Sequence, residues 1–119
     1  MNDFNWNEFY SLAKHLNDDY SFHCQEAVQR TIVSRAYYAA FGMAKEVLEH
    51  KYKNFIPQDS TSHKYVRIEY KKQGREDISD FLRDLRKYRN CCDYNKNLND
   101  LHELVNLSLQ KSEYIINSL

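Results

Sequence analysis

The chain has 119 residues, of which 42% are hydrophobic and 29% charged, with 17 Lys and Arg residues against 17 Asp and Glu residues. This length supports one hydrophobic core, and two glycines with one proline are too few turn residues for a β-sandwich, a barrel or a Rossmann unit. A formal net charge of zero excludes a global field that would drive the whole protein onto nucleic acid or an anionic membrane.

The N-terminal segment is polar, and its apolar residues recur at helical spacing. Asn5 or Asn7 is expected to cap a first helix that runs to about Leu16. This segment has no apolar signal core, and no apolar stretch approaches the ~20 residues that cross a bilayer, so we expect a cytoplasmic protein. Three cysteines, two of them adjacent, indicate free thiols, and neither a metal nor a cofactor is predicted.

A second helix is predicted from residue 24 to about residue 52, because no proline interrupts this stretch. At ~1.5 Å per residue it would be about 40 Å long. Its centre, residues 33–44, carries Arg35 as its single charge and is rich in small residues that allow another helix to approach closely. We expect this helix to be central and buried, and its small residues could also serve an oligomer interface.

Three more helices follow a loop at residues 54–62, which holds the single proline. They are expected at about residues 62–72, at 77 to 93 or 94, and from 98 to 116, with a break near Gly74 and a short connection at 95–97. The chain is therefore predicted to be one all-α domain, residues 1–119, folded as an antiparallel up-and-down helical bundle. It would contain about four major helices and a short one.

Charge is distributed unevenly along the chain. Residues 64–96 contain ten basic and six acidic side chains, a local charge of +4, which leaves −4 for the remainder. One interpretation is a modest phosphate-attracting face. The other is a solvated pair of helices with mixed charges.

The fourth predicted helix places polar side chains at the edge of its apolar face. At ~100° per residue, Arg86, Arg89 and Asp93 fall together at this edge, with Asn90 close by. In one interpretation, Arg89 and Asp93 form an i,i+4 ion pair, worth about 0.3 kcal/mol. In the other, the arginines offer paired donors to a phosphodiester. Further outward lie Arg83, Lys87 and Cys91.

Arg35 is the second notable arginine, because burying an unpaired charge is costly. A pairing with Asp93, or as a second choice with a Glu, would satisfy it, and this is the structural hypothesis that we favour. The functional rival is that Arg35 joins Arg86 and Arg89 at a phosphate.

Two segments together resemble the HEPN domain (higher eukaryotes and prokaryotes nucleotide-binding): SRAYYAAFGMAKEVLE at residues 34–49 and HKYVRIEYKKQGREDISDFLRDLRKYRNCCDYN at 63–95. The likeness is closest to small stand-alone bacterial and archaeal members whose last motif is Arg-x-x-x-Asp-Tyr. It implies an up-and-down α-helical bundle that usually forms a homodimer. It also implies a place among RNA-targeting toxins, antiviral defence components and partners of minimal nucleotidyltransferases.

Many HEPN proteins are metal-independent endoribonucleases with an Arg, four to six residues, and then a His. Arg89-Asn90 matches the start of that motif, but Tyr94 stands where the His is expected. His63 is interpreted first as a helix-start residue and second as a catalytic substitute. The candidate catalytic residues are Arg89, Asp93 and Tyr94, and the candidate RNA- or nucleotide-binding residues are Arg86, Arg89, Asn90 and Arg35.

Two functions remain open at this point. The first is a HEPN-type RNA- or nucleotide-associated protein of a bacterial defence or toxin–antitoxin system, including a degenerate or non-standard endoribonuclease. The second is a non-catalytic helical interaction module that docks a nucleotidyltransferase or a larger defence subunit. The missing His favours the second function, and the Arg-Asn pair favours the first.

Overall fold

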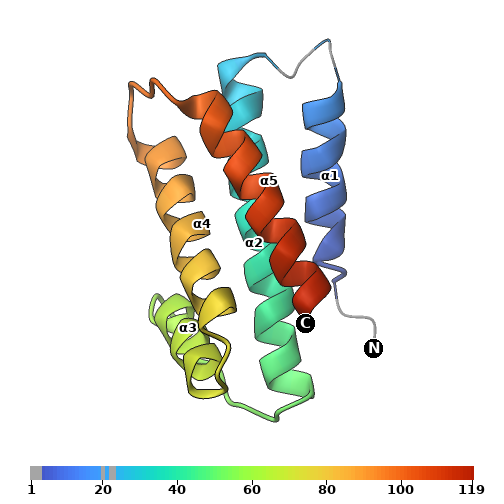
Figure 1. Cartoon of the computed structure of the whole chain (residues 1–119), viewed down its shortest axis with the longest axis vertical. Helices are drawn as coiled ribbons and strands as arrows, with labels where there is room; N and C mark the ends of the chain where they lie inside the picture. The colour runs from blue at the N-terminus through green and yellow to red at the C-terminus, as the bar shows by residue number, and fades with distance from the viewer. Residues whose placement is uncertain (1–3, 20, 22–23) are drawn as a thin grey trace.

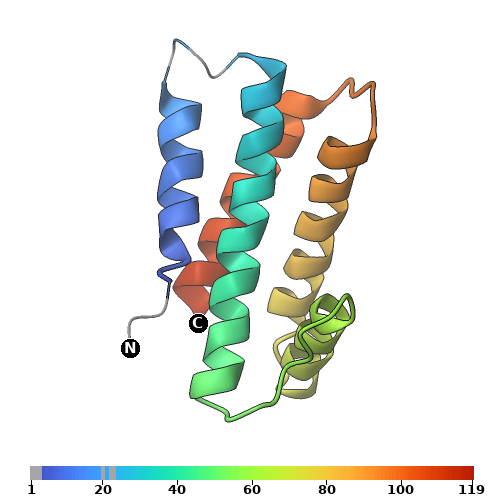
Figure 2. The same cartoon turned by 180° about the vertical axis from the view of Figure 1, so that it is seen from behind.

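Five helices account for most of the computed structural model, which describes residues 4–19, 21 and 24–119. Four of them lie side by side along the long axis and alternate in direction, whereas the short α3 lies against the first half of α4 (Figure 1). The reverse view shows α2 between α1 and α4, with α5 behind it (Figure 2). The predicted all-α up-and-down bundle is confirmed. The helices are α1 (Asn7–Asp18), α2 (Glu26–His50), α3 (Ser62–Lys72), α4 (Glu76–Tyr94) and α5 (Leu101–Ser118).

Helix α2 is the central element, as its apolar sequence predicts. Most side chains between residues 33 and 44 are buried by the chain's own helices. Trp6, just before α1, lies so close to Gly42 that a Cβ atom added there would be 2.0 Å from Trp6 Cδ2. Gly42 thus accommodates, within the same chain, the residue that leads into α1.

The connection between α3 and α4 is a tight turn that begins at Gly74. This glycine has a φ of 78°, in the left-handed region that favours glycine. The N–H of Gly74 donates to the carbonyl of Lys71 and the N–H of Arg75 to that of Tyr70, which satisfies carbonyls at the end of α3. The predicted break therefore directs α4 back along α3 and brings side chains of the two helices together.

The last helix begins three residues later than predicted. The chain turns extended at Asn95, and Arg30 of α2 holds the following loop by donating to the carbonyls of Cys92, Asn95 and Lys96. Leu98 packs against the core from this loop rather than from a helix. Its apolar character therefore reports burial and not helical conformation.

The core has two clusters that share α2. One joins α2 to α3 and α4 around Tyr37, Leu48 and Leu82, and the other joins α1, α2 and α5 around Ile32 and Val105. All three cysteines are free. None of the helices in the described ranges is long and apolar enough to span a membrane.

Candidate functional site

A pocket of about 450 Å³ opens along α4 next to α3. Its lining combines cationic, amide and aromatic side chains, a composition that suits phosphate and base groups. Because α4 runs back along α3, residues far apart in the sequence meet there. The lining residues are Arg67 of α3 together with Arg83, Arg86, Lys87, Asn90, Cys91, Tyr94 and Asn95. We call this set the α3–α4 pocket.

Arg67 and Arg86 are the arginines of the α3–α4 pocket that have no ion-pair partner among the described residues. Both side chains are partly buried, and the Nε atom of each is buried without a hydrogen-bond partner. No carboxylate of the described residues forms an ion pair with either guanidinium. A buried donor without a partner is unfavourable, so both groups retain capacity for an incoming acceptor such as a phosphate oxygen.

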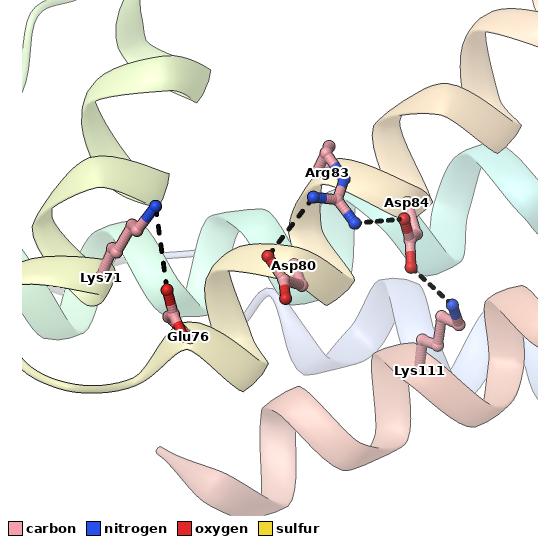
Figure 3. A network of polar contacts seen from close by, with 6 residues as sticks. All are labelled: Lys71, Glu76, Asp80, Arg83, Asp84 and Lys111. Atoms are coloured by element: carbon pink, nitrogen blue, oxygen red, sulfur yellow. Dashed lines mark hydrogen bonds and ion pairs between the residues drawn. The ribbon is translucent and has the colours of Figure 1, made fainter.

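Arg83 lines the same pocket, but its charge is compensated. Its guanidinium lies 3.4 Å from Asp80 and 3.2 Å from Asp84, and Asp84 also accepts from Lys111 at 2.7 Å (Figure 3). Lys71 and Glu76, drawn in the same view, pair at 3.8 Å. The sequence places Arg83 and Arg86 one helical turn apart, yet carboxylates neutralise the charge of Arg83 and not that of Arg86.

Arg89, the first residue of the predicted motif, turns away from the pocket toward α2. Its guanidinium lies 5.4 Å from the centroids of both the Tyr37 and Tyr38 rings and donates to the Tyr38 hydroxyl and, at 2.7 Å, to Asn90 Oδ1. Its Nε is 3.7 Å from Asp93 Oδ2, and its side chain is 13% exposed. The predicted Arg89–Asp93 pair is therefore present, and it holds Arg89 in the α2–α4 contact.

Arg35 does not pair with Asp93, so the structural hypothesis for this residue is wrong. Its guanidinium lies 4.8 Å from the Phe9 ring centroid and 5.2 Å from that of Tyr38, and it donates to Ser34 Oγ at 3.0 Å. The aromatic faces of α1 and α2 satisfy this cation without a carboxylate. Nor does it line the α3–α4 pocket, which leaves the rival phosphate role without a geometric basis.

His63, the second residue of α3, stands one helical turn before Arg67. Its imidazole stacks on Phe41 with centroids 4.4 Å apart, and its Nδ1 shares a hydrogen bond with the hydroxyl of the buried Tyr37. Residues four apart on a helix share a face, so His63 and Arg67 are neighbours on α3. His63 lies in the first turn of α3, as its interpretation as a helix-start residue predicts, and a catalytic role for it stays a prediction.

The surroundings of His63 favour its neutral form. Burial, followed by the positive charges of Arg86, Arg89, Arg67 and Lys45, lowers its pKa from 6.5 to about 4. Burial also raises the pKa of Tyr37 far above its ordinary value, so this phenol keeps its proton. At neutral pH the pair therefore consists of an uncharged imidazole and an uncharged phenol.

The structure brings together only part of the predicted site. Arg86, Asn90 and Tyr94 share the α3–α4 pocket, whereas Arg89, Asp93 and Arg35 do not line it. Tyr94 is 77% exposed. Sequence reasoning missed Arg67 as a site residue, although its spacing of four from His63 was a signal available in residues 62–72.

Comparison of the chain with protein-family models, with curated proteins and with solved structures finds no match.

Proposed function

We propose that this protein is a HEPN-type RNA-associated protein that binds RNA phosphates in the α3–α4 pocket. Support comes from the two sequence segments that resemble HEPN domains and from Arg67 and Arg86, two unpaired guanidiniums lining one pocket. Guanidinium forks match the geometry of phosphate oxygens. A bacterial defence or toxin–antitoxin system, with a homodimer as the working unit, is the setting that the resemblance suggests.

The observation that carries this proposal is the absence of a described carboxylate partner for Arg67 and Arg86. A paired arginine must break an existing contact before it binds phosphate, whereas an unpaired and partly desolvated one gains a partner. The α3–α4 pocket also contains Lys87, which has no ion-pair partner among the described residues and adds to the positive potential.

Binding of labelled mixed-sequence RNA, measured by fluorescence anisotropy over a salt series, tests the proposal. We expect Arg86→Ala and Arg67→Ala each to weaken binding about tenfold and to reduce the slope of log affinity against log salt by about one. Arg83→Ala is the matched control, since it lines the same pocket but is neutralised by Asp80 and Asp84; we expect a change below about threefold. Equal losses in all three variants, or no RNA binding by the parent protein, would refute the proposal.

RNA cleavage is a second candidate function, and the observation in its favour is that His63 stands one helical turn before Arg67, next to the α3–α4 pocket but outside its lining. In metal-independent cleavage, the 2′-oxygen attacks phosphorus and the bond to the 5′-oxygen breaks; water protonates the leaving 5′-oxygen, giving a 2′,3′-cyclic phosphate and a 5′-hydroxyl. A neutral imidazole can accept the 2′-hydroxyl proton, and positive side chains offset charge at the phosphorane. The low pKa of His63, about 4, leaves it neutral for this task.

Incubation of mixed RNA with the protein in EDTA tests this second candidate. Cyclic-phosphate ends that persist in EDTA and disappear in His63→Ala and Arg86→Ala would support cleavage. Binding without such ends would leave an RNA-binding protein. Failure of both binding and cleavage would favour the non-catalytic interaction module, a role consistent with the internal contacts of Arg89 and Asp93. Light scattering of the purified protein tests the homodimer.

A further inference from the structure

We propose that the α3–α4 pocket is selective for unpaired RNA, with one base stacked on Tyr94 while the phosphates contact Arg67 and Arg86. This inference rests on the proposed function and deepens it, because phosphate binding alone does not separate single strands from duplexes.

Tyr94 has the surroundings of a stacking platform. It is the last residue of α4, its side chain is 77% exposed, and it lines the pocket together with the arginines. Its ring contacts no aromatic ring or cation, and its hydroxyl no hydrogen-bond partner, among the described residues. An exposed aromatic face beside a cationic groove is the combination that binds single-stranded nucleic acid without strong sequence preference.

The spacing along α4 suits a short run of nucleotides. Tyr94 follows Arg86 by eight residues, which corresponds to ~12 Å along a helix. Stacked nucleotides rise ~3.4 Å each, so about three or four nucleotides cover this distance. In a duplex the base faces are already stacked and paired, so they cannot reach an exposed ring, whereas an unpaired base can.

Asn90 adds a polar contact between the two ends of this run. Its Oδ1 accepts from Arg89 Nη2 at 2.7 Å, which fixes the amide orientation and leaves Nδ2 as the free donor. That donor lies in the lining of the α3–α4 pocket and suits a carbonyl oxygen on a base edge. Arg89 therefore acts as a positioning residue for Asn90.

The test compares a labelled twelve-nucleotide single-stranded RNA with the same strand annealed to its complement. We expect the single strand to bind at least tenfold more tightly than the duplex. Tyr94→Ala should weaken binding of the single strand about tenfold and leave binding of the duplex unchanged, while Tyr94→Phe should retain the affinity, because stacking needs the ring and not the hydroxyl. Tyr52→Ala is the control, an exposed tyrosine outside the α3–α4 pocket.

The outcomes separate this inference from the proposed function. Loss of binding in Arg86→Ala with unchanged binding in Tyr94→Ala would overturn the inference and leave phosphate binding intact, as would equal affinity for single strand and duplex. Absence of binding to either RNA would overturn the proposed function itself. Unchanged thermal unfolding of Tyr94→Ala, expected for a side chain this exposed, would exclude misfolding as the cause of any loss.

Discussion

Two arginines, one at the start of α4 and one near its middle, have opposite surroundings. At its start, Arg75 donates to both carboxylate oxygens of Asp77, at 3.2 and 3.1 Å, and to the carbonyl of Ser118. Asp77 also accepts from the Tyr114 hydroxyl at 2.5 Å. Near the middle of the helix, Arg86 has no carboxylate partner among the described residues. Arg75 therefore stabilises the fold through its hydrogen bonds, whereas Arg86 keeps donors available to a ligand.

This difference shows why local net charge is a poor guide to a binding surface. The segment of charge +4 contains cations whose donors are occupied and cations whose donors are not, and the sequence counts them equally. Pairing is decided by which helix faces each side chain. Substitutions of Arg86, Asp77 and Asp84 each alter one side of this contrast.

The largest expected effect concerns His63, whose pKa is lowered first by burial and then by positive charges, of which Arg86 contributes most. Its folded pKa of about 4 lies below the ordinary value of 6.5, so the unfolded chain takes up the proton first. The contribution of His63 to stability is complete above about pH 6.5 and is lost as the pH falls toward 4. Arg86→Ala should raise the pKa of His63 and reduce this loss, as measured by NMR titration and by urea unfolding at pH 7.5 and 5.

Arg83→Ala is the control for this titration, because its charge is balanced by Asp80 and Asp84. We expect the pKa of His63 to stay where it is in that variant. An equal shift in both variants would mean that the distinction between paired and unpaired arginines has no electrostatic consequence at this site.

A smaller effect is expected at the start of α4. The hydrogen bonds from Arg75 and Tyr114 hold the pKa of Asp77 well below its ordinary value of 3.8. Its stabilisation is therefore present above about pH 4 and is lost as the pH falls further. Because Asp77 is 36% exposed, solvent screening limits the cost of Asp77→Asn to about 1 kcal/mol at pH 7. Denaturant unfolding at pH 7 and pH 2.5 should show the difference shrinking at the lower pH, with RNA binding unaffected.

The smallest effect is a gain rather than a loss. Asp84→Asn removes the carboxylate that pairs with Lys111 and one of the two that pair with Arg83, so Arg83 keeps only Asp80 at 3.4 Å and the α3–α4 pocket becomes more positive (Figure 3). We expect RNA affinity at low salt to rise about threefold, and the gain to vanish at high salt. Glu76→Gln, which frees Lys71 outside that pocket, is the matched control. Equal affinities in the parent protein and Asp84→Asn would contradict this account of Arg83.

Helical periodicity was sufficient to predict the bundle. The third helix has the predicted bounds, and the fourth begins one residue earlier, because apolar spacing and Gly74 act locally. The errors occur where tertiary contacts decide. Leu98 continues the apolar pattern, yet Arg30 ties the adjacent carbonyls into a loop before α5 begins.

The candidate site was harder to predict, since a helical wheel cannot tell which neighbour each edge meets. Arg86 and Arg89 are three residues apart and fall on the same edge of α4. Arg89 nevertheless donates a hydrogen bond to the hydroxyl of Tyr38 on α2, while Arg86 lines the α3–α4 pocket. Arg67 reaches the α3–α4 pocket only because the turn at Gly74 directs α4 back along α3. Side-chain partners of this kind arise from packing between helices and not from spacing within one.

The contact between Trp6 and Gly42 also supplies an optical probe. Trp6 is the single tryptophan of the chain, and its indole rests against α2 on the glycine. Its emission therefore reports whether the N-terminal helix remains docked, separately from signals of the ten tyrosines. Red-shifted emission that precedes loss of helicity during unfolding would identify detachment of α1 as an early event.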